Sequence, residues 1–147
     1  MNTHVPPRQL LVNKSASLDT SNQPIARLQN RIGRTYRFES AHHLPLVPEG
    51  HKCKNMHGHT YRLRVLLEGD PDPQFGWVMD FAELKAIMQP VLDKIDHKLM
   101  NELPGLENPT CEHIAIWLWN QLKPSLPKLT RIELHETPTT GAIYEGV

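Results

Sequence analysis

The segment from His57 to Leu67 alternates between two kinds of side chain, and this alternation limits the folds that the chain can adopt. Successive side chains of a β-strand point to opposite faces, so the period of two predicts a half-buried strand over residues 57–68. One face consists of His57, His59, Tyr61, Leu63, Val65 and Leu67. The other face carries Arg62, Arg64 and Glu68. The inner face is therefore apolar at one end and carries two histidines at the other.

The same kind of pattern predicts three further strands. Residues 34–42 form the first of them, and Pro45 and Pro48 end its pattern. Its inner face is expected to consist of Tyr36, Phe38, Ser40 and His42. Two more strands are expected near the end of the chain, over residues 129–136 and from Gly141 through Tyr144.

Two amphipathic helices are expected between the second and third strands. Asp80 and Glu83 have the spacing of a capping box, so the first helix begins at Asp80. Pro90 is expected to kink or split this helix, whose buried face is predicted as Phe81, Leu84, Ile87, Met88, Val91, Leu92 and Ile95. Thr110 is the expected N-cap of the second helix, whose apolar side chains are Ile114, Trp117, Leu118 and Leu122. This order of elements predicts an α+β fold, an antiparallel sheet with two helices on one face.

Composition limits the number of domains and the possible partners. The chain of 147 residues has the length of one domain, and its 16 basic and 16 acidic side chains cancel at pH 7. This balance argues against nucleic acid and membrane surfaces, which usually require excess Lys and Arg. Residues 1–30 are polar and predict a disordered tail before one catalytic domain over residues 31–147. A transit peptide is the alternative for the tail.

Two further observations favour a cytoplasmic protein. The apolar runs are much shorter than the roughly 20 residues that a membrane-spanning helix needs. The two cysteines, Cys53 and Cys111, are too few for a disulfide framework and fit a reducing compartment.

Five of the nine histidines fall between residues 42 and 59. His57 and His59 share one face of a predicted strand, so their imidazoles can converge on one ion. His42 offers a third ligand from the neighbouring strand, and three protein ligands with an open position are typical of catalytic zinc. The sequence also allows Cys53 as a zinc ligand, or a cluster of histidines without any metal.

The cysteines differ in their neighbours. Cys53 lies between Lys52 and Lys54, and such cationic neighbours favour a reactive thiolate. Cys111 follows the N-cap of the second helix and precedes Glu112, whose carboxylate opposes a thiolate. We interpret Cys111 as a half-buried packing residue.

Two acidic positions are further candidates. Asp96 and His97 end the first helix, either as an exposed pair or as a proton donor with a tuning carboxylate. Adjacent residues point in different directions, so we expect no direct pairing of these two side chains.

Glu136 shares a face with Ile132 and Leu134, and a carboxylate pointing inward needs a partner. That partner is either an Arg in a structural ion pair or a ligand with a guanidine-like edge.

Together these segments resemble the 6-pyruvoyltetrahydropterin synthase superfamily over residues 34–147, and most of all its carboxytetrahydropterin branch of the queuosine pathway. The segments that carry the resemblance are Phe38-Glu39-Ser40-Ala41-His42, Gly50-His51-Lys52-Cys53, His57-Gly58-His59, Asp80-Phe81-Ala82-Glu83-Leu84-Lys85, Asp96-His97 with Asn101, Pro104-Gly105-Leu106-Glu107-Asn108-Pro109-Thr110 and Glu136-Thr137. Three residues separate Cys53 from His57, as in that branch, whereas pyruvoyl-forming enzymes usually have a longer gap. The chain departs from the family pattern at His43, where Arg occurs, and at Cys111, where Ser or Ala is common.

The resemblance implies a zinc-dependent lyase of the tunnelling fold, in which subunits pair their sheets into an oligomeric barrel, typically a homohexamer with active sites between subunits. The implied zinc ligands are His42, His57 and His59. The implied general base is Cys53, with His97 and Asp96 as its proton-relay partners. Glu136 would hold the pterin ring, and Thr110 is a further expected substrate-binding residue. The implied reaction converts 7,8-dihydroneopterin triphosphate to 6-carboxy-5,6,7,8-tetrahydropterin, acetaldehyde and triphosphate.

Two alternative functions stay open from the sequence. The first is a 6-pyruvoyltetrahydropterin synthase, which has the same site and retains the carbon–carbon bond. The second is a noncatalytic binding module stabilised by zinc. Such a module predicts a closed site with Cys53 as the fourth ligand and has no need of His97 or Glu136.

Overall fold

The structure is a computed structural model that describes residues 30–147. Its elements are β1 (Asn30–His42), η1 (Lys52–Lys54), β2 (His57–Gly69), α1 (Phe81–Ile95), η2 (Met100–Glu102), α2 (Cys111–Leu122), β3 (Leu129–Thr137) and β4 (Thr140–Tyr144). The predicted tail over residues 1–30 lies outside the described residues, except for Asn30, which opens β1. β1 therefore begins four residues before its predicted start, because pairing with β2 continues past Gly33, where the side-chain alternation is interrupted.

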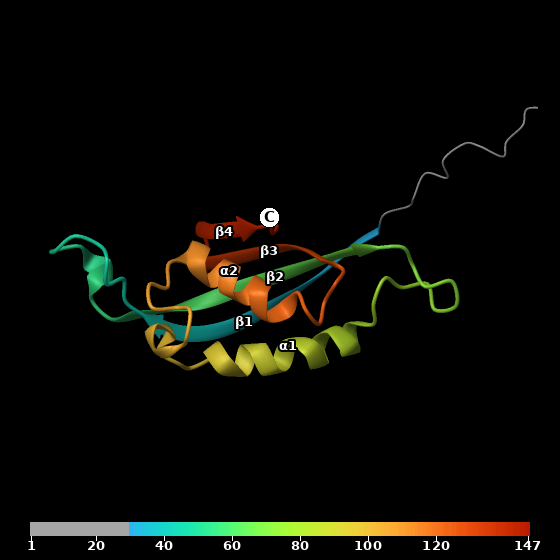
Figure 1. The fold of residues 1–147 in the computed structure, drawn as a ribbon, viewed down its shortest axis with the longest axis horizontal. Helices are drawn as coiled ribbons and strands as arrows, with labels where there is room; N and C mark the ends of the chain where they lie inside the picture. Colours follow the sequence, from blue (N-terminus) through green and yellow to red (C-terminus); the bar gives the residue numbers. More distant parts are fainter. Residues whose placement is uncertain (1–29) are drawn as a thin grey trace, which may run out of the picture.

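The four strands form one antiparallel sheet in the order β1-β2-β3-β4 (Figure 1). β1 and β2 pair over their full lengths, from Asn30 opposite Gly69 to His42 opposite His57. β3 pairs only with the part of β2 from Arg62 to Leu67. Beyond Arg62, β1 and β2 therefore continue as a two-stranded ribbon, and two of the three candidate histidine ligands lie at its end.

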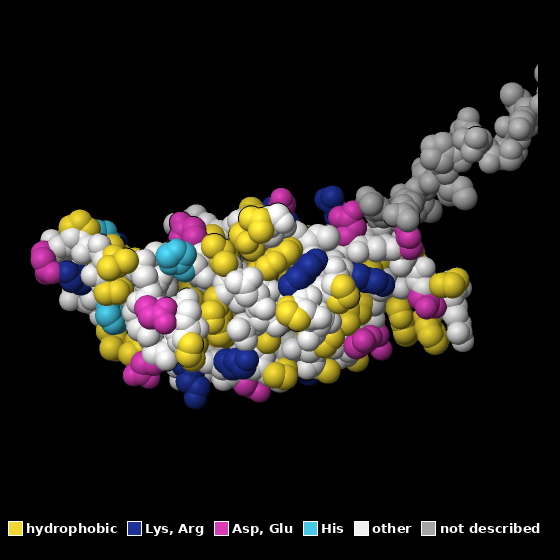
Figure 2. All heavy atoms as spheres, viewed as in Figure 1, with side chains coloured by type: hydrophobic (Ala, Val, Ile, Leu, Met, Phe, Trp, Pro, Cys, Tyr) yellow, Lys and Arg dark blue, Asp and Glu magenta, His cyan; other side chains and the backbone are white. Residues whose placement is uncertain are grey.

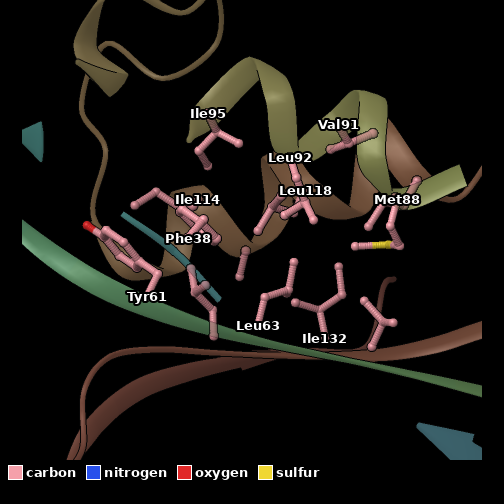
Figure 3. Close-up of a cluster of buried hydrophobic side chains, with 14 of the residues drawn as sticks. Phe38, Tyr61, Leu63, Met88, Val91, Leu92, Ile95, Ile114, Leu118 and Ile132 are labelled. Carbon is pink, nitrogen blue, oxygen red and sulfur yellow. The ribbon is translucent and has the colours of Figure 1, made fainter. Parts of the chain in front are cut away.

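Both helices cover the same face of this sheet, as predicted, and enclose one hydrophobic core (Figure 3). Leu63 of β2 and Ile132 of β3 are fully buried beneath Leu118 of α2 and Leu92 of α1. Complete burial of such a side chain contributes about 1.5–3 kcal/mol through the hydrophobic effect. Tyr61 lies at one end of the cluster in Figure 3, with its hydroxyl group pointing out of it.

The predicted helix starts are confirmed. The Asp80 carboxylate accepts a hydrogen bond from the Ala82 backbone N–H at 2.8 Å. The Thr110 hydroxyl accepts one from the His113 N–H at 3.2 Å. Each cap satisfies a backbone donor that has no partner within its own helix.

The predicted burial of Phe81 is wrong, and of the two effects expected at Pro90 the split of the helix is wrong. Pro90 does not split the helix, which runs unbroken from Phe81 to Ile95. Pro90 has no N–H to donate to the Ala86 carbonyl group four residues earlier. Ala86 is exposed, so water can donate a hydrogen bond to that carbonyl instead. Phe81 does not join the core, since 48% of its surface is exposed. It occupies the first position of the helix, where its backbone carbonyl accepts a hydrogen bond from Arg34 of β1 at 2.8 Å while its side chain stays at the surface.

The surface carries mixed charge. Figure 2 shows acidic and basic side chains interspersed over the face that carries both helices, so this face has no dominant sign of charge. Within residues 30–147, no helix combines the length and apolar character needed to cross a membrane.

Candidate active site

Three histidines converge at the end of the β1–β2 ribbon. His42 lies directly opposite His57 in the antiparallel pairing, and His59 projects to the same face two residues further along β2. One ring nitrogen from each lies within 4.8 Å of the other two. His42 is buried and the other two are half-buried, so the group opens to solvent on one side. The strand period in the sequence predicted this convergence.

Hydrogen bonds fix the tautomers of two of these rings. His42 Nδ1 lies 2.8 Å from the Pro109 carbonyl oxygen, and His57 Nδ1 lies 2.7 Å from that of Asn55. A carbonyl only accepts, so in the neutral rings both protons lie on Nδ1 and both Nε2 atoms carry free lone pairs. These two Nε2 atoms face each other at 3.1 Å. Two lone pairs at this distance repel unless a cation lies between them.

A metal ion fits this arrangement. Tetrahedral ligands with metal–nitrogen bonds of about 2.0–2.1 Å lie about 3.3 Å apart, close to the observed separation of the two Nε2 atoms. Burial lowers the pKa of His42, and the neighbouring rings of His57 and His59 lower it further. Burial also lowers the pKa of His59, which the Glu136 carboxylate partly opposes. Both shifts favour the neutral imidazole that a metal requires.

The histidines form one wall of a pocket of about 480 Å³. Cys53 and Lys52 of η1 and Glu136 of β3 also line it. These side chains lie far apart in the sequence. The pairing of β1 with β2 brings η1, which lies in their connection, to the same end of the sheet as the β3–β4 hairpin.

Cys53 lies in the pocket beside the histidines but does not join them as a ligand. The only group of metal-binding side chains found in the described part of the chain contains His42, His57 and His59. The backbone N–H of Cys53 donates to His51 Nδ1 at 3.1 Å, and its carbonyl accepts from Leu44 N–H at 2.8 Å. The backbone is thus held while the half-buried thiol stays free. Within residues 30–147, no fourth side chain joins the three histidines to make the closed site expected of a structural zinc module.

Glu136 lines the pocket from the end of β3, two residues beyond the buried Leu134. The pairing of β3 with β4 shifts register between His135 and Thr137, so Glu136 lies at a bulge. Its side chain is half-buried, and among residues 30–147 no Lys or Arg nitrogen lies within 4.0 Å of its carboxylate. The structural ion pair considered from the sequence is therefore not formed in this region, and the carboxylate is free for a ligand.

Asp96 and His97 form the pair that we did not expect. His97 adopts a left-handed backbone conformation with φ of 57°, which turns its ring back so that Nδ1 lies 3.0 Å from Asp96 Oδ1. The prediction that their side chains diverge is wrong because it assumed ordinary backbone angles at both residues. Asp96 Oδ1 also accepts the Glu39 backbone N–H at 2.9 Å, which is the main cause that lowers the pKa of Asp96.

This pair faces a different pocket from Cys53. His97 lines a hollow of about 510 Å³ together with Glu39, Ala41 and Gly58. These strand residues point away from the core, whereas His42 and Cys53 lie in the other pocket, and His59 touches both. A single chain therefore does not bring His97 and Cys53 into one pocket.

Thr110 is held by its capping hydrogen bond and does not line the histidine pocket. Its assignment as a substrate-binding residue stays a prediction.

Three supporting residues had no role in the prediction from sequence. The Pro109 carbonyl orients His42. Asn101 holds the chain after His42, donating to the His43 carbonyl at 2.8 Å and accepting its N–H at 3.0 Å.

Tyr61 is the third of these supporting residues. It is fully buried, its hydroxyl lies 3.5 Å from His42 Nδ1, and its ring packs edge-on against His59 with centroids 5.6 Å apart. The alternation of the strand already placed Tyr61 on the same face as His57 and His59, which was the available signal.

An open three-histidine group beside a free thiol and an unpaired carboxylate is typical of an enzyme rather than of a structural metal site. Comparison with known proteins identifies its family. The family described as 6-pyruvoyl tetrahydropterin synthase matches residues 31–147. The chain therefore belongs to the 6-pyruvoyl tetrahydropterin synthase family, whose members act on pterins.

Individual relatives differ in their named activities. A 6-carboxy-5,6,7,8-tetrahydropterin synthase of Synechocystis is 40% identical over 119 residues, which cover 77% of this chain and 91% of the relative. A dihydroneopterin monophosphate aldolase of Pyrococcus furiosus is 35% identical over 80% of this chain and 99% of its own. The structure of 6-pyruvoyl tetrahydropterin synthase from Caenorhabditis elegans superposes with a TM-score of 0.75 at 31% identity, covering 81% of this chain and 96% of that one.

Proposed function

We propose that this protein is a zinc-dependent 6-carboxy-5,6,7,8-tetrahydropterin synthase. It converts 7,8-dihydroneopterin triphosphate, with uptake of water, to 6-carboxy-5,6,7,8-tetrahydropterin, acetaldehyde and triphosphate. This reaction belongs to the biosynthesis of queuosine, a 7-deazaguanine nucleoside. Its place is the cytoplasm, which agrees with the two free cysteines among the described residues.

The observation that carries the proposal is the content of a single pocket. The imidazoles of His42, His57 and His59, the Cys53 thiol and the Glu136 carboxylate line it together, and Cys53 lies outside the histidine group. This set separates metal binding, proton abstraction and ring recognition into three different groups. The similarity to the Synechocystis enzyme and the gap of three residues between Cys53 and His57 favour the carboxy-forming reaction.

Zinc bound by His42, His57 and His59 would supply Lewis acidity toward the side-chain hydroxyls of the substrate. The chain's own residues do the rest. The Glu136 carboxylate grips the guanidine-like edge of the pterin with two parallel hydrogen bonds. The Cys53 thiolate removes a proton from a side-chain carbon, as a general base within reach of the held substrate. The Pro109 and Asn55 carbonyls keep the imidazole protons on Nδ1 throughout.

His97 completes the proton chemistry in an oligomer. Its ring is 73% exposed, and it faces the other pocket in its own chain, so it is accessible to a neighbouring subunit. Asp96 orients the ring through Nδ1, and Nε2, which lies 3.6 Å from Glu39 Oε2, is the nitrogen that exchanges protons. We accordingly propose a homohexamer in which His97 and Asp96 of one chain serve Cys53 of another, with the sheets closed into a barrel.

The second candidate is a 6-pyruvoyl tetrahydropterin synthase, which eliminates triphosphate without cleaving the carbon–carbon bond. The specific observation in its favour is the superposition on the enzyme from Caenorhabditis elegans. The same metal site, thiol and carboxylate serve both reactions, so the products must decide between them.

The deciding experiment is a turnover assay of the zinc-loaded protein with 7,8-dihydroneopterin triphosphate, with acetaldehyde and pterin products quantified separately. Equal amounts of acetaldehyde and 6-carboxytetrahydropterin are expected. A pyruvoyl pterin without acetaldehyde would establish the second candidate instead. Cys53→Ala should abolish turnover and keep zinc, whereas Cys111→Ala, the matched control, should keep both. Loss of zinc together with folding in Cys53→Ala would contradict the assignment of Cys53 as a base.

A further inference from the structure

Two lysines flank Cys53 in η1, and their surroundings differ. Lys54 is half-buried and forms an ion pair with Glu49. Lys52 is exposed at the edge of the histidine pocket and lines it. Within the described part of the chain, no carboxylate lies within 4.0 Å of the Lys52 ammonium group. The pocket therefore has a cation at its edge whose charge is not neutralised by the protein.

Lys52 and Glu136 enter the pocket from different elements. Glu136 comes from β3 and lines the same pocket as His59. Lys52 comes from η1, in the connection between β1 and β2. The other residues that line the pocket include no second Lys or Arg. A bound molecule would thus meet a carboxylate from one element, the histidine group, and an ammonium group from another.

The backbone around Lys52 is well held, although its side chain is free. The His51 carbonyl accepts the Lys54 N–H at 3.0 Å, and the Lys52 carbonyl accepts the Asn55 N–H at 3.2 Å. His51 also accepts the Cys53 N–H through its ring. The backbone of this turn is therefore already ordered. A ligand that binds the Lys52 ammonium group has to order only the side chain, which lowers the entropic cost of binding.

We infer that Lys52 binds the phosphate groups of the substrate and sets the preference of the site for a phosphorylated pterin. This inference rests on the proposed function. The substrate has a ring with a guanidine-like donor edge at one end, hydroxyl groups in the middle and a triphosphate at the other end. With the ring at Glu136 and the hydroxyl groups at the histidines, the triphosphate must extend away from Glu136. Among residues 30–147, Lys52 is the one Lys or Arg that lines this pocket, and an ammonium group is a suitable point charge for phosphate.

The experiment compares two ligands that differ only in their phosphates, 7,8-dihydroneopterin triphosphate and 7,8-dihydroneopterin. Both are titrated calorimetrically into zinc-loaded Cys53→Ala protein, in which turnover is blocked, with zinc content measured before and after. Lys52→Gln is added to this protein, and Lys54→Gln is the matched control from the same turn. Lys52→Arg is the conservative variant that keeps the charge.

Lys52→Gln should weaken binding of the triphosphate about tenfold, the loss expected for one charge-assisted hydrogen bond at an exposed site. Binding of 7,8-dihydroneopterin should change less than about twofold, Lys54→Gln should affect neither ligand, and Lys52→Arg should restore the preference. Equal weakening of both ligands, or no weakening of either, would overturn the assignment of Lys52. Wild-type protein that turns over no substrate, yet shows the Lys52-dependent preference, would overturn the proposed function and leave the Lys52 site standing.

Discussion

The two cysteines should differ sharply in reactivity, and the difference tests the electrostatic description of the site. Cys111 is 8% exposed, and its thiol donates to the Leu134 carbonyl at 3.3 Å. Burial is the main cause that raises the pKa of Cys111, with the Glu136 and Glu112 carboxylates adding to it, to about 11 from an ordinary 9.0. Cys53 lies half-buried in an open pocket and is the internal comparison.

The size of the effect follows from the pKa of Cys111. Alkylation proceeds through the thiolate, and a pKa raised by about two units lowers the thiolate fraction at pH 8 about a hundredfold. The low exposure of the side chain slows the reaction further. Cys111 of the native protein should therefore react with iodoacetamide at least about a hundred times more slowly than an ordinary free thiol.

The assay is timed alkylation at pH 8 followed by mass spectrometry of the two cysteine-containing peptides. Native protein should be labelled at Cys53 first, and protein in urea should be labelled at both positions at similar rates. The native Cys53→Ala variant should take up almost no label. Alkylation of native Cys111 within tenfold of a small-molecule thiol would refute the reasoning, since neither burial nor the nearby carboxylates could then be suppressing its thiolate.

Three further changes probe the metal group, the Asp96 contact and the β3–β4 hairpin. His42→Ala should reduce bound zinc well below one per chain by elemental analysis, while His113→Ala, outside the group, should keep it; equal zinc in both variants would contradict the assignment of ligands. Asp96→Asn should lower the free energy of unfolding at pH 7 by about 1 kcal/mol or less. The Asp96 carboxyl has a lowered pKa in the folded state, so its contribution is present above pH 3.8 and is lost as the pH falls through the folded value. A difference between Asp96→Asn and wild type that persisted unchanged at still lower pH would be inconsistent with this origin. Gly141→Ala should cost about 1–3 kcal/mol in urea unfolding, because the new Cβ would lie 2.5 Å from the Leu134 carbonyl oxygen; wild-type stability would show that the hairpin yields at no cost.

Sequence periodicity could predict those parts of the fold in which the type of each residue reflects its burial within a single strand or helix. The alternation through Leu63 and Val65 placed the core and the histidines on one face, and the caps at Asp80 and Thr110 placed both helices. These features depend on local hydrogen bonds and on burial, which a short segment already encodes.

The parts that it could not predict depend on backbone exceptions and on contacts between distant segments. The pairing of Asp96 with His97 needs a positive φ that no pattern around it announces. The register shift between His135 and Thr137 arises only when β3 meets β4. The contact of His42 with the Pro109 carbonyl joins residues 67 positions apart. Such features become visible only when the tertiary structure is assembled.

β2 is paired on both edges only from Arg62 to Leu67, and from His57 to Tyr61 it is paired with β1 alone. One half of the strand is therefore an inner strand of the sheet over the core, and the other half carries the histidines of the site. Substitutions at His57 and His59 need not disturb the layer of leucines and isoleucines that keeps the protein folded, whereas Tyr61 of the same segment belongs to the core. Side chains of the pocket can therefore change while the core stays the same, and the relatives of this chain carry three different named activities.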